Sequence, residues 1–141
     1  MENAIVYEYN VDASDFTRAG EASSDIKKKL KEMGVSPEII RKVAIAMYEG
    51  EINMVIHAKG GTITVEITPD DIIMVLKDVG PGIPDVEKAM QAGWSTAPEE
   101  VRNLGFGAGM GLPNMKKNTD SMEIETEIGK GTTITMAVNM A

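Results

Sequence analysis

The stretch Asp78-Val79-Gly80-Pro81-Gly82-Ile83-Pro84 follows directly on an apolar, β-branched run that ends at Lys77. A carboxylate at the end of a strand can accept a hydrogen bond from an adenine amino group, and glycines allow a flat base to approach the backbone. The same residues also suit a turn in which the aspartate caps the backbone. The candidate ligands of a nucleotide base are therefore Asp78, Gly80, Gly82 and Ile83, and a plain turn is the alternative.

Upstream of this stretch, Glu49 and Asn53 form a second candidate site in a segment predicted to be helical. Residues four apart lie on one face of a helix. A carboxylate there can take the proton of an attacking hydroxyl, and an amide oxygen one turn away is a hard ligand that suits Mg²⁺. A solvated polar face is the alternative for such a pair. Glu51 lies on the other side of the helix and is predicted to face solvent.

Downstream, Gly105-Phe106-Gly107-Ala108-Gly109-Met110-Gly111-Leu112 places glycine at every second position before a predicted helix. Backbone N–H groups that small residues leave accessible at a helix N-terminus bind phosphate. The stretch lacks the GK[ST] of a Walker A loop and does not fit the Rossmann GxGxxG spacing. The candidate phosphate ligands are Gly107, Gly109, Gly111 and Leu112, and a loop without function is the alternative.

Hydrophobic periodicity predicts the elements around these motifs. The predicted strands are 5–11, 62–68, 72–77, 122–127 and 132–138, and the predicted helices are 14–33, 37–57, 85–92 and 111–120. Gly34 is expected to end the first helix and Ser36 to cap the second, in which Gly50 costs ~1 kcal/mol relative to alanine. This order is not a βαβ alternation, so it predicts an α+β sandwich with a mixed sheet.

Composition limits the classes of function. The chain has 141 residues, a net charge of −8 and no cysteine, which favours one domain over residues 1–141 and excludes disulfides and thiolate chemistry. The negative charge argues against binding to nucleic acid or to an anionic membrane surface. No secretory signal or membrane-spanning run is visible, so a cytoplasmic protein is expected. The 11 methionines are expected to fill the core.

Taken in order, the motifs Glu-x-x-x-Asn, Asp-x-Gly-x-Gly-Ile-Pro, Gly-x-Gly-x-Gly-Leu and Gly-Lys-Gly-Thr resemble those of the Bergerat-fold (GHKL) nucleotide-binding family. That family includes gyrase, Hsp90 and the histidine kinases. The length favours its small branch, the anti-sigma-factor serine/threonine kinases and the related switch kinases of partner-switching modules. The resemblance implies a two-layer α/β sandwich with a mixed, mainly antiparallel sheet.

The resemblance also implies a role for each candidate residue. Glu49 matches the catalytic base of the family, Asn53 the magnesium ligand, and Asp78 the aspartate that reads adenine. Thr132 matches the threonine that supports this aspartate, often through water. His57, one turn beyond Asn53, is expected to be a structural residue at the helix end.

For the phosphate end of the nucleotide, the resemblance implies a glycine box at Gly107, Gly109 and Gly111 and an ATP lid over residues 94–110. The lid is longer than in the short switch kinases, and the arginine that sigma-binding members carry before the last glycines is missing. Arg102, within the lid, is a candidate substitute. Lys116 is expected to be a surface residue, with phosphate contact as the alternative.

The function implied is that of an ATP- and Mg²⁺-dependent protein serine/threonine kinase. Its substrate would be a STAS-domain antagonist protein of a partner-switching module. The alternative is a nucleotide-gated binding module with little kinase activity, which sequesters a sigma factor or activates a downstream regulator such as a phosphatase. A homodimer is a further expectation, since sigma-binding relatives commonly form one.

Overall fold

A computed structural model describes residues 4–11, 20–57, 60–80 and 111–140. Its strands are β1 (Ile5–Val11), β2 (Gly61–Ile67), β3 (Asp71–Asp78), β4 (Ser121–Glu127) and β5 (Gly131–Asn139). Its helices are α1 (Glu21–Glu32), α2 (Pro37–His57) and α5 (Gly111–Lys117). The predicted strands and the second helix are confirmed to within a few residues.

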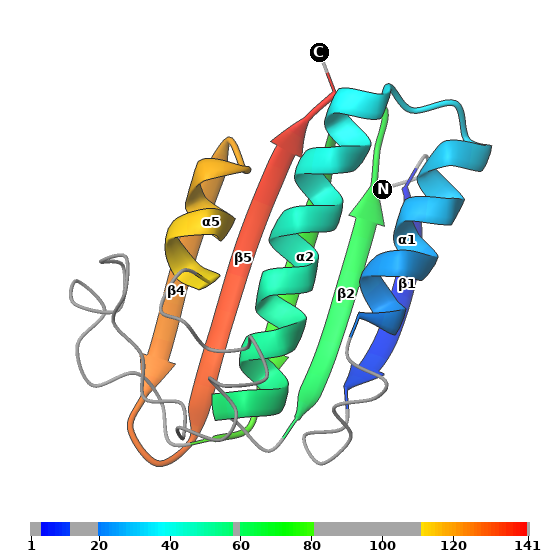
Figure 1. Cartoon of the computed structure of the whole chain (residues 1–141). Helices are drawn as coiled ribbons and strands as arrows, with labels where there is room; N and C mark the ends of the chain where they lie inside the picture. The colour runs from blue at the N-terminus through cyan, green and yellow to red at the C-terminus, as the bar shows by residue number, and fades with distance from the viewer. Residues whose placement is uncertain (1–3, 12–19, 58–59, 81–110, 141) are drawn as a thin grey trace.

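The five strands form one sheet in the order β1-β2-β3-β5-β4. The three helices within the described residues lie on the same face of it, with α2 over the middle, α1 toward β1 and α5 toward β4 (Figure 1). This arrangement confirms the predicted two-layer α+β sandwich.

The hydrophobic core lies between the helices and the inner face of the sheet. Alternate residues of the central strands point into it, because successive side chains of a strand face opposite sides. These buried strand residues are Ile63, Val65, Ile67, Ile72, Met74, Leu76, Ile134, Met136 and Val138. Met47, Met54 and Met115 of the helices are also buried, so methionine is a core residue here as predicted.

Helices α1 and α2 meet at a short connection with the expected signals. Gly34 has a φ of +79° just after α1, and the Val35 N–H donates to the Leu30 carbonyl at 3.1 Å, which closes the helix end. The Ile39 N–H donates to Ser36 Oγ at 3.4 Å at the start of α2.

Gly50 allows α2 to approach the sheet closely. A Cβ atom at this position would lie 2.1 Å from Leu76 Cδ2 and 3.3 Å from Met115 Cε. Only glycine therefore fits between α2, β3 and α5 without displacing a neighbour, and this close approach offsets the loss of helix propensity.

One expectation about the fold is corrected. The four strand pairings within the described residues are all antiparallel, so the expected parallel component of a mixed sheet is not found there. Two predicted helices stay predictions in part or whole: α1 is described from Glu21, while residues 14–19 of the predicted first helix and the predicted helix 85–92 lie outside the described ranges.

Candidate functional site

Asp78 lies at the last position of β3, where its side chain meets the start of β5. The Thr132 backbone N–H donates to Asp78 Oδ1 at 2.8 Å. Thr132 is buried, and its hydroxyl oxygen lies 2.9 Å from Thr126 Oγ1 of β4. Thr132 thus supports the aspartate through its backbone, while its hydroxyl joins the two strands of the last hairpin.

The backbone around Asp78 is packed too closely for side chains on its neighbours. A Cβ atom on Gly131, which has a φ of +146°, would lie 2.3 Å from the Asp78 carbonyl oxygen and 3.1 Å from Oδ1. A Cβ atom on Gly61 would lie 2.1 Å from the Lys77 carbonyl oxygen. The Gly80 N–H donates to the Lys130 carbonyl at 3.2 Å, so the contact between the β3 and β5 segments continues past the end of β3. Two glycines therefore set the position of the carboxylate.

Asp78 is half-buried, and burial raises the pKa of its carboxyl above the ordinary value, an effect that the hydrogen bond from Thr132 opposes. One carboxylate oxygen is held by the protein, so the other is the natural acceptor for a ligand. Hydrogen bonds to a partly desolvated carboxylate are stronger than in water. The residues fit a site that recognises a hydrogen-bond donor such as an amino group.

Glu49 and Asn53 lie one turn apart on α2, and both contact α5. Asn114 Nδ2 donates to Glu49 Oε1 at 3.4 Å, and Asn53 Nδ2 lies 4.0 Å from Met115 Sδ. Both α2 residues are half-buried. The contact of Asn53 with Met115 uses the amide nitrogen, so the amide oxygen is the Asn53 atom that suits a hard cation.

The prediction that Glu51 faces solvent is wrong. Its side chain is only 3% exposed. Oε2 accepts the backbone N–H groups of Gly20 at 2.9 Å and Ala22 at 3.1 Å, and Oε1 accepts that of Ser23 at 3.2 Å. Glu51 therefore caps the N-terminus of the neighbouring helix α1, whose own N-cap residue is a glycine.

The remaining predicted residues are only partly described. Gly111 is the first residue of α5 and Leu112 is buried behind it, whereas Lys116 is exposed and His57 is the last residue of α2. The residues that lie outside the described ranges are Gly82, Ile83, Gly107, Gly109, Arg102 and the predicted lid 94–110.

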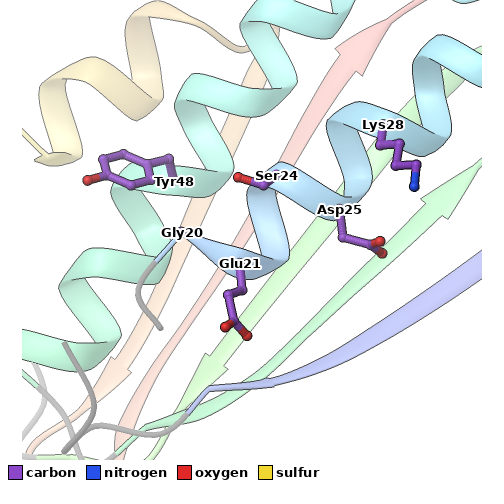
Figure 2. A pocket seen from close by; sticks show the side chains of 6 residues that line it. All are labelled: Gly20, Glu21, Ser24, Asp25, Lys28 and Tyr48. Atoms are coloured by element: carbon purple, nitrogen blue, oxygen red, sulfur yellow. The ribbon is translucent and has the colours of Figure 1, made fainter. Parts of the chain in front are cut away.

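A shallow hollow between α1 and α2 was not predicted. Figure 2 shows Tyr48 of α2 on one side of it and, on the other, Gly20 and the α1 side chains of Glu21, Ser24, Asp25 and Lys28. Gly20, with a φ of +98°, lies so close to the Tyr48 ring that a Cβ atom would be 3.1 Å from Cε1. The hollow shares no residue with the contacts of Asp78.

Two residues that contact the candidate site were missed from sequence. Thr126 faces Thr132 across the last hairpin, and the alternation of β4 places it on the inner face of the sheet. Asn114 is a polar residue between the buried Leu112 and Met115, and such a position signals a side-chain partner on the neighbouring helix.

Residues 13–138 match the family model of the histidine kinase-like ATPase domain. The chain belongs to this family. The five-stranded sheet with helices on one face is thus the scaffold of a histidine kinase-like ATPase domain, and the GHKL resemblance of the motifs is confirmed.

Relatives of this ATPase domain include regulators of sigma factors and a protein kinase. An anti-sigma F factor of Caldanaerobacter subterraneus subsp. tengcongensis is 40% identical over 104 residues, which cover 70% of this chain and 69% of that protein. The serine/threonine-protein kinase RsbT of Bacillus subtilis is 32% identical over 108 residues, which cover 74% of this chain and 75% of that protein.

A solved structure shares the fold of this ATPase domain. The RsbU and RsbW domains of Rv1364c from Mycobacterium tuberculosis match 95% of this chain and 32% of that chain, with a TM-score of 0.64 and 16% sequence identity. In the part of the chain that the structure describes, no helix combines the length and apolar character needed to cross a bilayer.

Proposed function

We propose that this protein is an ATP-dependent protein serine/threonine kinase of a partner-switching module. The observation that carries the proposal is the placement of Glu49 and Asn53 on one face of α2, where both contact α5, the helix that begins at Gly111. The scaffold is a histidine kinase-like ATPase domain, and one relative is named a serine/threonine-protein kinase.

Asp78 is proposed to bind the adenine of ATP. Its second oxygen would accept a hydrogen bond from the exocyclic amino group, while Thr132 holds the first oxygen in place. Gly80 and Gly82 would allow the flat ring to lie against the backbone. Thr132 contributes to selectivity because it fixes the direction in which the carboxylate accepts.

Glu49 is proposed to accept the proton of the acceptor hydroxyl. The hydroxyl oxygen forms a bond to the γ-phosphorus of ATP, the bond from that phosphorus to the β–γ bridging oxygen breaks, and ADP leaves. The proton of the hydroxyl passes to the Glu49 carboxylate. The oxygen of Asn53, with the phosphates, would hold Mg²⁺, which neutralises charge on the phosphoryl group.

A STAS-domain protein is the proposed acceptor. The support is the family branch that the motifs resemble, together with relatives named anti-sigma F factor. Those names also support the second candidate, a nucleotide-gated module that binds a sigma factor or a downstream regulator and transfers little phosphate.

The test is transfer of label from γ-labelled ATP, with Mg²⁺, to STAS-domain proteins encoded nearby. Glu49→Gln is expected to reduce the rate by at least about 100-fold, since it removes the proton acceptor and keeps the side-chain shape. Glu38→Gln is the matched control, because Glu38 lies in the first turn of the same helix and is exposed.

The two candidates give different results in this experiment. Label on a serine or threonine of the acceptor, lost with Glu49→Gln and retained with Glu38→Gln, supports the kinase. Unlabelled acceptor together with ATP-dependent binding of a partner that survives Glu49→Gln contradicts the kinase and supports the nucleotide-gated module.

A further inference from the structure

Helix α5 meets the proposed catalytic face of α2 through two consecutive residues. Met115 is fully buried, its Cε would lie 3.3 Å from a Cβ atom on Gly50, and its sulfur lies 4.0 Å from Asn53 Nδ2. Asn114 is half-buried, and its amide nitrogen reaches Glu49 Oε1 at 3.4 Å. The burial of Met115 therefore fixes the part of α5 from which Asn114 reaches the proposed base.

The chemistry of an asparagine suits this position. Its neutral amide donates to one carboxylate oxygen and leaves the charge and the second oxygen of Glu49 for the acceptor hydroxyl. A cationic side chain here would form an ion pair and weaken the base, and an apolar one would leave the carboxylate free to rotate among its rotamers. Lys116, the nearest cation along α5, is exposed.

We infer that Asn114 is a positioning residue that orients the Glu49 carboxylate for proton transfer. The inference rests on the proposed function, because it assigns the residue that aims the proposed base. It accounts for a polar side chain between the buried Leu112 and Met115 of a seven-residue helix.

Two variants of Asn114 and one control test the inference. Asn114→Ala removes the donor, and Asn114→Asp keeps the shape but replaces the donor with an acceptor. Asn118→Ala is the control, since it removes the bond from Asn118 Nδ2 to the Asn114 carbonyl, 2.8 Å long, and spares the Asn114 side chain. We would measure ATP affinity, ATP hydrolysis with Mg²⁺ alone, and phosphoryl transfer to the STAS-domain acceptor at saturating ATP.

Both Asn114 variants are expected to lower the maximal rate roughly tenfold, because a misaligned base loses much of its effect. Their ATP affinity should stay within about twofold of the wild type, and Asn118→Ala should keep the wild-type rate. In a Glu49→Gln background, Asn114→Ala should change the residual rate by less than about twofold, since the group that it positions is gone.

Equal losses from Asn114→Ala in both backgrounds would overturn the inference and leave the proposed kinase intact. A raised KM for ATP with an unchanged maximal rate would do the same. If the wild type hydrolyses ATP but transfers no phosphate to the acceptor, the proposed function is contradicted. The ATP hydrolysis rates of the Asn114 variants then test whether Asn114 positions Glu49. A wild type inert toward both water and acceptor overturns both.

Discussion

Replacement of Glu51 by glutamine measures what the buried carboxylate contributes to stability. Glu51 accepts three backbone N–H groups at the start of α1, two on Oε2 and one on Oε1. A glutamine can keep its oxygen toward Gly20 and Ala22, but its NH₂ group then faces the Ser23 N–H. One hydrogen bond is lost, and a buried donor is left without an acceptor.

The cost follows from these contacts. An unsatisfied buried donor costs about 1–3 kcal/mol, and loss of the negative charge at a partly buried helix N-terminus costs up to about 2 kcal/mol. The neutral amide of glutamine is easier to bury than a carboxylate, and this gain offsets part of these two costs. We expect Glu51→Gln to lower the free energy of unfolding by about 2 kcal/mol, which for a domain of this size lowers Tm by roughly 6–8 °C.

Urea denaturation followed by circular dichroism measures this loss, and Glu49→Gln is the matched control. It is the same chemical change two residues away, at a half-buried side chain with one long hydrogen bond, and should cost less than about 0.5 kcal/mol. In the kinase assay the order of the two variants is reversed. At temperatures well below its Tm, Glu51→Gln is expected to keep the wild-type rate, whereas Glu49→Gln is expected to lose it. Equal urea midpoints for the two variants would refute the capping role of Glu51.

Three further substitutions test the site and the packing beneath it. Burial raises the pKa of Asp78 above its unfolded value of 3.8, so the charged carboxylate lowers the free energy of unfolding. This loss of stability is absent at pH values below 3.8, where the carboxyl is protonated in both states, and is complete once the pH exceeds the folded pKa. Asp78→Asn is therefore expected to raise the urea midpoint at about pH 7 but not at about pH 3, while ATP binding measured by calorimetry is lost because an amide replaces the acceptor. Gly131→Ala should lower the free energy of unfolding by about 2 kcal/mol or more and weaken ATP binding, since its Cβ would strike the Asp78 carbonyl. Gly129→Ala is the control: it has open space around it at a φ of +84°, so it should lower the free energy of unfolding by about 1 kcal/mol and leave ATP affinity unchanged. Gly50→Ala should destabilise by about 1 kcal/mol in thermal melts despite its better helix propensity, and combining it with Leu76→Val should cost less than the sum of the two, because the valine lacks the colliding Cδ2 atom.

Local signals predicted the elements well because they act over a few residues. Ser36 and Gly34 mark the connection between α1 and α2, and β-branched runs identified β2, β3 and β5 to within a few residues. The motif order likewise identified the family, since it depends on residue type and spacing alone. Asp78 and Thr132, distant in sequence, were paired by the resemblance, and the structure brings them to 2.8 Å.

Contacts between elements were harder to predict. Glu51 was expected to face solvent because its helical angle differs from that of Glu49, but that angle does not indicate whether another helix begins beside it. Asn114 was missed for a related reason, since its partner lies on a helix far away in the chain. The parallel component expected of the sheet depended on strand order, which periodicity does not determine.

The strand order β1-β2-β3-β5-β4 also governs when the chain can finish folding. The pairing of Val11 with Gly61 encloses both α1 and α2, so β1 must wait for a segment made much later. Strand β4 pairs with β5, which is synthesised after it and is inserted between β3 and β4. Such non-local pairing slows folding, because loop entropy is lost before contacts compensate for it. The bond between Asp78 and Thr132 forms in the same late insertion. A nascent chain that ends before β5 would lack it, so ATP affinity should emerge only once that strand has been added.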